Sequence, residues 1–145
     1  MSWVHDNIIL SYHVDFENEV LAMKTHYTYY NDSKAPENTD VIFTGYLTHD
    51  FSNAMRRSII FDIEKYPLDR FLEEARELLE ERKNYWWPIK YKNEKELVEY
   101  LQANQYKVFS IYASIGLGGY VFAKQKDIIV NGRPVVDGQL LEYEE

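Results

Sequence analysis

Apolar and polar residues alternate along residues 7–16 of this 145-residue chain. Ile8, Leu10, Tyr12 and Val14 would therefore share one face, and a period of two residues is typical of a half-buried β-strand. Similar strand-like patterns return in five later segments, so the sequence predicts a sheet of about six strands. The later segments are residues 20–30, 40–47, 58–64, 106–115 and 120–125.

Turn residues between these segments predict which strands pair. A two-residue loop at Asn18 and Glu19 would place Phe16 opposite Leu21 and bring two apolar faces together. The dipeptide Asn131-Gly132 predicts a further hairpin near the C-terminus, because it favours tight turns between strands. Residues 116–119 contain three glycines, but a strand rather than a helix follows them, which favours a turn over a phosphate-binding loop.

Two segments in the middle of the chain have helical spacing. Pro67 suits the first turn of a helix, where its missing N–H costs nothing, and an apolar stripe predicts that this helix continues to about Lys83. Asn93 and Glu96 resemble a capping box and predict a second helix to about Asn104. Residues 49–57, between the predicted strands at 40–47 and 58–64, are also expected to hold a turn of helix.

The order of these segments predicts the fold. Four strands, two helices and two strands, with the C-terminal hairpin as a further element, segregate along the chain. Segregated runs of this kind favour an α+β fold, in which an antiparallel sheet carries both helices on one face. In residues 58–64 we expect Ile59, Phe61 and Ile63 to face the core. No linker or repeat divides the sequence, so residues 1–145 are expected to form a single domain.

Charge and composition exclude several functions. The formal net charge of −8 disfavours nucleic acids and anionic membranes, because an acidic surface repels phosphate groups. The sequence has no signal-peptide pattern, no apolar run of roughly 20 residues and no cysteine, so we expect a soluble cytoplasmic protein. Its four histidines lack the helical spacing of metal ligands, and no catalytic serine motif is present. We therefore expect no cofactor, no metal and no catalytic residue.

An acidic stripe is the strongest indication of function. Asp69, Glu73, Glu77 and Glu81 place a carboxylate at every fourth position of the first predicted helix. Neighbours at that spacing lie on one face and repel each other by about 0.2–0.5 kcal/mol per pair. The stripe therefore opposes helix formation, and either solubility or a cationic partner would account for it.

Aromatic residues provide two further candidate surfaces. Trp86 and Trp87 follow the first predicted helix, and at least one of them is expected to fill the space beneath the connection between the helices. An exposed tryptophan beside the acidic stripe would suit a partner that is cationic and partly apolar, because tryptophan and tyrosine dominate binding hot spots. Tyr46 and Tyr112 are expected to lie on the outer face of the sheet, together with Tyr106.

Several segments resemble a known group of proteins. They are the opening hairpin, DVIFTGYLTHDF (40–51), IIFDIEKYPLDRFLEE (59–74) and SIGLGGYVFAK (114–124). Together they resemble the small, acidic, bacterial YxiG-like proteins, whose activity is unknown. The resemblance implies an immunity role near polymorphic toxin genes, and it transfers no catalytic or binding residue.

Two hypotheses follow. The first is a non-enzymatic protein-binding domain, of the immunity-protein kind, that captures a basic partner through its acidic face. The alternative is a small-ligand-binding protein or enzyme with an aromatic-lined cavity between helices and sheet. A homo-oligomer formed through an edge strand or the outer sheet face also stays open. The residues expected to bind a partner are Asp69, Glu73, Glu77, Glu81, Trp86, Trp87, Tyr46 and Tyr112.

Overall fold

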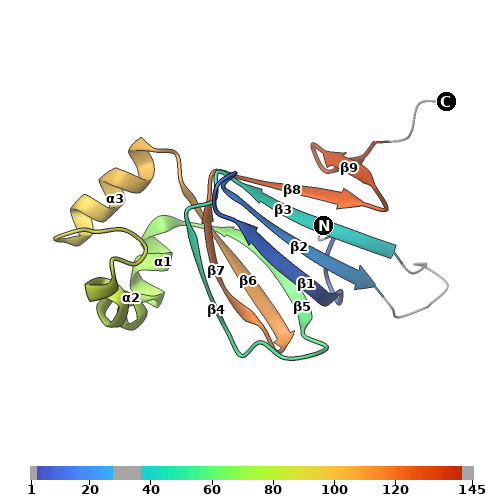
Figure 1. Cartoon of the computed structure of the whole chain (residues 1–145), viewed down its shortest axis with the longest axis horizontal. Coiled ribbons are helices and arrows are strands. Elements are labelled where there is room, and N and C mark those ends of the chain that lie inside the picture. The colour runs from blue at the N-terminus through green and yellow to red at the C-terminus, as the bar shows by residue number, and fades with distance from the viewer. Residues whose placement is uncertain (1–2, 28–36, 142–145) are drawn as a thin grey trace.

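The computed structural model describes residues 3–27 and 37–141 (Figure 1). Its elements follow in the order β1 (Ile8–Asp15), β2 (Val20–Tyr27), β3 (Glu37–Thr44), β4 (Thr48–Ser52), β5 (Ile59–Tyr66), α1 (Leu68–Glu74), α2 (Arg76–Arg82), the 3-10 helix η1 (Lys83–Tyr85), α3 (Glu94–Ala103), β6 (Lys107–Ile115), β7 (Gly118–Ala123), β8 (Gln125–Val130), β9 (Arg133–Val136) and β10 (Gln139–Leu140). No helix within these residues is long and apolar enough to cross a membrane.

The expected α+β fold with six strands and two helices is wrong. In the described residues, one antiparallel sheet of ten strands has the order β10-β9-β8-β3-β2-β1-β5-β6-β7-β4. Two parts of the chain account for the difference. Residues 48–52, where a turn of helix was expected, form the edge strand β4, and β8, β9 and β10 extend the other end of the sheet. The fold is therefore mostly β.

The sheet bends so that its two halves enclose the main core. Figure 1 shows β1, β2, β3 and β8 in one half, with β5, β6, β7 and β4 in the other. Phe43 of β3 meets Phe109 of β6 across the core, with ring centroids 5.4 Å apart. Burial of each large apolar side chain stabilises the fold by about 1.5–3 kcal/mol. Buried residues of this core include Leu21, Met23, Val41, Phe43, Ile60, Ile63, Phe109, Ile111, Val121 and Ala123.

A second core lies between the helices and the outer face of β6 and β7. Phe71 of α1 packs edge-on against Phe122 of β7, with ring centroids 5.2 Å apart. Leu97 and Leu101 bring the apolar stripe of α3 to the same cluster. The helices thus cover sheet residues that would otherwise face solvent.

Local signals predicted some elements correctly. The side chain of Asn93 accepts a hydrogen bond from the Glu96 amide at 2.9 Å, and α3 begins at the next residue. Asn131 and Gly132 have φ angles of 49° and 79° and connect β8 to β9, which confirms the predicted hairpin. The first predicted helix is instead two helices, since Ala75, with φ −97° and ψ 18°, interrupts it.

The register of the opening hairpin differs from the prediction. Val14 pairs with Leu21 and Asp15 with Val20, so residues 16–19 form a four-residue loop. Asp15 stabilises that loop by accepting hydrogen bonds from the Asn18 amide at 3.0 Å and the Asn18 side chain at 2.7 Å. Phe16 is consequently exposed in the loop rather than paired with Leu21.

Strand β5 also departs from simple alternation. Its pairing with β6 shifts register around Ile60, so Ile60 and Ile63 are buried while Phe61 is exposed. A bulge adds one residue to one strand and changes which face the following side chains occupy. The expected inward face of Ile59, Phe61 and Ile63 is therefore wrong at Phe61.

Candidate functional site

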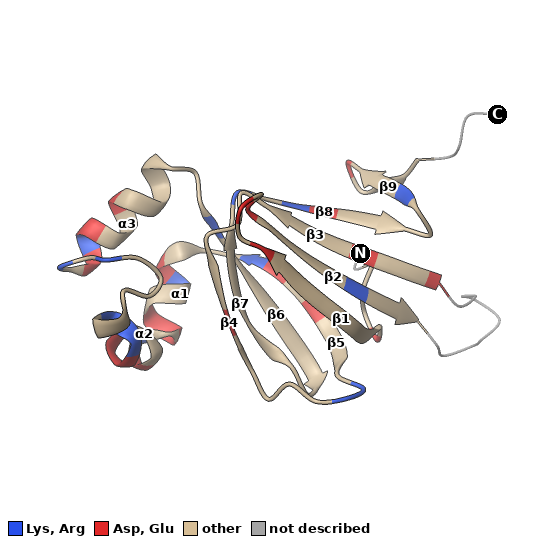
Figure 2. Ribbon diagram, in the orientation of Figure 1, with Lys and Arg blue, Asp and Glu red and all other residues tan. Residues whose placement is uncertain are grey.

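The four carboxylates of the acidic stripe lie on the outer side of the helical layer. Asp69 and Glu73 belong to α1, Glu77 and Glu81 belong to α2, and all four are exposed. Figure 2 shows acidic residues on both helices, at the end of the molecule away from β8 and β9. Within each helix the two carboxylates are four residues apart and share a face.

Three basic residues of α1, α2 and η1 are engaged elsewhere. Arg82 pairs with Asp50 of β4 at 3.0 Å, and the Arg70 guanidinium lies 4.6 Å from the centre of the Tyr66 ring. Lys83 donates to the carbonyl oxygen of Lys92 at 2.9 Å. In the part of the chain that the structure describes, no ion pair joins any of the four stripe carboxylates to a basic side chain. The four carboxylates thus have no ion-pair partner among these residues, although Arg76 of α2 is exposed next to Glu77 and adds a positive charge to the same layer.

Two exposed aromatic side chains follow the stripe directly. Tyr85 ends η1 with 81% of its surface exposed, and Trp86 is 63% exposed. Trp86 has a φ of 60°, and the Lys90 ammonium lies 5.0 Å from the centre of its ring. We define the acidic–aromatic surface as Asp69, Glu73, Glu77, Glu81, Tyr85 and Trp86.

Trp87 has a structural position. Its indole N–H donates to the carbonyl oxygen of His49 at 3.3 Å, and its ring lies 5.5 Å from Phe122, centre to centre. Half-buried, it fills the space between the helix connection and the sheet. One of the two tryptophans is thus packed inside, and the other faces solvent.

The expected tyrosine-bearing open sheet face does not exist at Tyr46 and Tyr112. Tyr46 is buried and its hydroxyl group lies 2.6 Å from Nδ1 of His49. Tyr112 is half-buried beside the helical core, because the helices cover the outer face of β6. Its hydroxyl donates to the Tyr66 hydroxyl, which in turn donates to Glu74 at 2.6 Å. Neither tyrosine joins the acidic–aromatic surface.

The environment of two side chains in these clusters shifts their pKa values. Burial raises the pKa of Tyr66, and its hydrogen bonds to Glu74 and Tyr112 act in the same direction. Burial lowers the pKa of His49, against the smaller opposing effect of Asp50. Both groups are therefore held in their neutral forms near pH 7, Tyr66 as a phenol and His49 as an imidazole.

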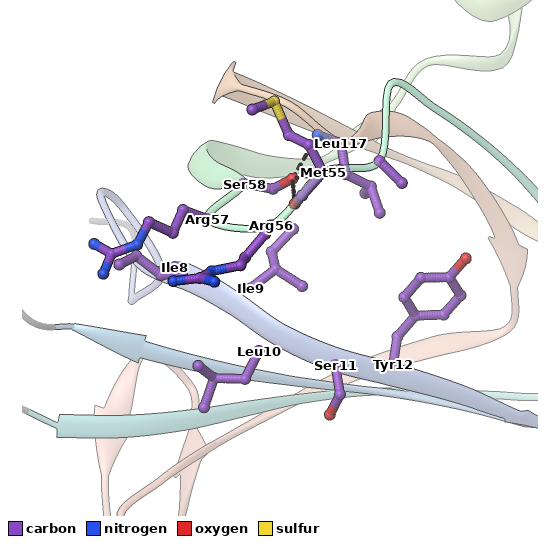
Figure 3. Close-up of a pocket in the computed structure, with 11 residues that line it drawn as sticks. Ile8, Ile9, Leu10, Ser11, Tyr12, Met55, Arg56, Arg57, Ser58 and Leu117 are labelled. Carbon is purple, nitrogen blue, oxygen red and sulfur yellow. Dashed lines mark hydrogen bonds between the residues drawn. The ribbon is translucent and has the colours of Figure 1, made fainter.

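A hollow of ligand-site size lies outside the expected place. Between the helices is a space of only about 80 Å³, lined by α1, α2 and α3 residues such as Leu72, Leu79 and Leu97. A cleft of about 860 Å³ instead lies between β1 and the loop that joins β4 to β5 (Figure 3). Cavities of roughly 300–1,000 Å³ are the usual size of ligand sites.

The cleft exists because β1 leaves β5 almost at once. These two strands pair only at Ile8 and Ile59, with a further hydrogen bond from the Ile9 amide to the Ser58 carbonyl at 2.9 Å. From Leu10 onward, that edge of β1 pairs with no strand within residues 3–27 and 37–141. Sequence patterns give no signal for this separation, although the Arg56-Arg57 pair beside it is visible as a short basic patch.

Comparison of the chain with protein-family models, curated proteins and solved structures finds no match. The candidate sites therefore rest on their geometry and chemistry. Two surfaces stand out: the acidic–aromatic surface on the helices and the cleft beside β1.

Proposed function

We propose that this chain is a protein-binding module, of the immunity-protein kind, that captures a basic protein through its acidic–aromatic surface. The observation that carries the proposal is the exposed stripe of Asp69, Glu73, Glu77 and Glu81, which has no ion-pair partner among the described residues and is followed in the chain by the exposed rings of Tyr85 and Trp86. We place this function in the cytoplasm, as the cysteine-free sequence led us to expect.

The charge of the surface would act mainly on association. Carboxylates concentrated on one end of a protein attract a basic partner and can raise association rates by roughly 10–1,000-fold at low salt. Arg82 is paired with Asp50, so its charge is offset by that carboxylate rather than by the stripe. The formal net charge of −8 has the same sign as the local field.

The two exposed rings would supply short-range affinity. Tyr85 and Trp86 extend from a short 3-10 helix whose neighbour, Trp87, is packed against Phe122. A large ring presented from an anchored connection loses little conformational freedom on binding. Tyrosine and tryptophan are also the commonest hot-spot residues. A basic partner with an apolar contact patch fits both features, and a toxin domain neutralised by this chain would be such a partner.

The test is affinity capture from the source organism by three forms of the chain. They are the wild type, a stripe variant (Glu73→Lys with Glu77→Lys) and a control variant (Glu17→Lys with Glu64→Lys). All four positions are exposed, and both variants change the net charge equally. We expect the wild type and the control to retain one basic protein in stoichiometric amount, released by salt, and the stripe variant to lose it.

Circular dichroism of each variant checks that its fold is intact. Equal retention of the basic protein by the stripe variant would refute the proposed surface. A partner released equally from both variants would show that overall charge, rather than this stripe, drives binding.

A further inference from the structure

The cleft beside β1 has an apolar interior with one charged end. Ile9 and Leu117 contribute to its apolar lining, and Leu10, Tyr12 and Met55 border it (Figure 3). Leu10 and Met55, which border this hollow, are 60% and 58% exposed. Contiguous exposed apolar surface with a polar rim is typical of a ligand or partner site.

One wall of the cleft is fixed by a buried serine. Ser58, only 2% exposed, donates its hydroxyl hydrogen to the Met55 carbonyl at 2.7 Å and accepts from the Leu117 amide at 3.0 Å. Gly116 packs so closely on this serine that an added Cβ would overlap its Oγ. The β4–β5 loop is thereby attached to the β6–β7 turn, so the hollow is formed before any ligand arrives.

The far end of the cleft is closed by aromatic contacts. The Tyr12 ring lies edge-on to Phe51 of β4, with centroids 5.0 Å apart, and 5.9 Å from the ring of His49. These contacts connect β1 to β4 by side chains, although the two strands do not pair. The cleft therefore has a firm apolar end and an open end.

Arg56 and Arg57 provide the charge at the open end. Both are exposed and line the cleft, and Figure 3 shows them near Ile8, at the end opposite Tyr12. Neither makes an ion pair with a described residue. Arg57 also has a φ of 67°, a left-handed conformation that is uncommon for a residue other than glycine. Two adjacent, unpaired guanidinium groups are unexpected in a chain of net charge −8.

We propose that this cleft binds a single-chain amphiphilic anion, a free molecule with an apolar tail and a carboxylate head. The tail lies along Ile9 and Met55 toward Tyr12, and the head accepts hydrogen bonds from the guanidinium groups of Arg56 and Arg57. Guanidinium groups bind carboxylates through paired, charge-assisted hydrogen bonds. The site is separate from the acidic–aromatic surface, so neither proposal depends on the other.

Because the protein as a whole is acidic, the proposal predicts that the cleft distinguishes anionic from cationic head groups. An acidic protein repels anions in general, so preferential binding of an anion requires a local positive site. A cationic amphiphile of the same chain length would have the opposite preference, because the rest of the surface attracts it and the arginine pair repels it. Head-group preference at the cleft therefore reports on Arg56 and Arg57 alone.

Methionine methyl NMR offers a direct test with decanoate as the probe, kept below its micelle concentration. The chain has three methionines, of which Met55 borders the cleft and Met23 is fully buried in the main core. We expect decanoate to shift the Met55 methyl resonance in a saturable manner and to leave Met23 in place. Acetate, which lacks the tail, and decyltrimethylammonium, which reverses the charge, are expected to produce no saturable shift at Met55.

Two matched variants identify the head-group site. Arg56→Gln with Arg57→Asn removes both charges, and asparagine tolerates the left-handed backbone at position 57. Lys24→Gln with Lys107→Gln removes two charges from exposed strand positions outside the cleft. We expect the first variant to weaken decanoate binding by roughly tenfold or more and the second to leave it unchanged.

Other results would overturn the proposal. Equal binding of decyltrimethylammonium, unchanged affinity in the double-arginine variant, or no saturable shift at Met55 would each contradict it. Binding to vesicles of anionic phospholipid without binding of free decanoate would assign the cleft to a membrane surface instead. An unshifted Met23 resonance in every variant verifies that the core is intact.

Discussion

Ser58→Ala tests how the cleft wall is held. The substitution removes one oxygen atom from a buried position, together with its hydrogen bonds to the Met55 carbonyl and the Leu117 amide. The Met55 carbonyl also accepts a hydrogen bond from the Ser58 amide at 3.2 Å, which the substitution leaves in place. Leu117 is buried, so its amide would lose its partner without access to water.

The expected destabilisation comes mainly from the buried Leu117 amide rather than from the Met55 carbonyl. An unsatisfied buried amide costs about 1–3 kcal/mol, whereas the Met55 bond contributes at most about 1 kcal/mol net. We therefore expect the free energy of unfolding to fall by about 2 kcal/mol. For a chain of this size that change lowers the melting temperature by about 4–8 °C.

Urea unfolding followed by circular dichroism measures this change. Ser114→Ala is the matched control, because Ser114 is exposed on β6, and we expect it to change stability by less than about 0.5 kcal/mol. If Ser58→Ala were as mild as the control, the serine would not hold the loop, and the preformed cleft would lose its structural basis. The same variant should also bind decanoate more weakly, because its wall is free to move.

Two further predictions concern the sheet and the tyrosine cluster. Gly119 has a φ of 149°, and an added Cβ would overlap the Asp50 carbonyl oxygen, so Gly119→Ala should detach β4 and lower the melting temperature. Gly118→Ala is the control and should lower the melting temperature less, because Gly118 has more space and no positive φ. Equal effects of the two substitutions would contradict this packing. The raised pKa of Tyr66 stabilises the fold below the unfolded pKa of about 10, and that contribution is lost as pH rises above it. Urea unfolding between pH 9 and about 11 should therefore show a steeper loss of stability for the wild type than for Tyr66→Phe, and parallel curves would refute the assignment.

Short-range signals predicted the parts of the fold that depend on neighbouring residues. The Asn93 cap and the Asn131-Gly132 hairpin are fixed by contacts within a few residues, so the sequence contains the information directly. Bulges depend on how a strand pairs with distant partners. The register shift in β5 that exposes Phe61 has no local signature, and the strict alternation of apolar residues therefore misled the prediction there.

The sequence predicted the exposure of the charged residues of the candidate site but not the positions of its aromatic residues. Glu73 and Glu77 are exposed on helices, as their spacing indicates. Tyr46 could not be placed from sequence, because its burial depends on β4. Residues 48–52 have no alternating pattern that would predict this strand. The cleft beside β1 was also hidden, since it arises where two strands distant in sequence stop pairing at Ile9.

The association rate of the captured basic partner, measured against ionic strength, tests the central proposal most directly. Attraction by exposed carboxylates is screened by salt, so the wild type and the Glu17→Lys, Glu64→Lys control should show a steep fall in rate. The Glu73→Lys, Glu77→Lys variant should associate more slowly at low salt and depend less on salt. Parallel salt dependences for the wild type and the stripe variant would contradict a role for the acidic–aromatic surface in capturing the partner.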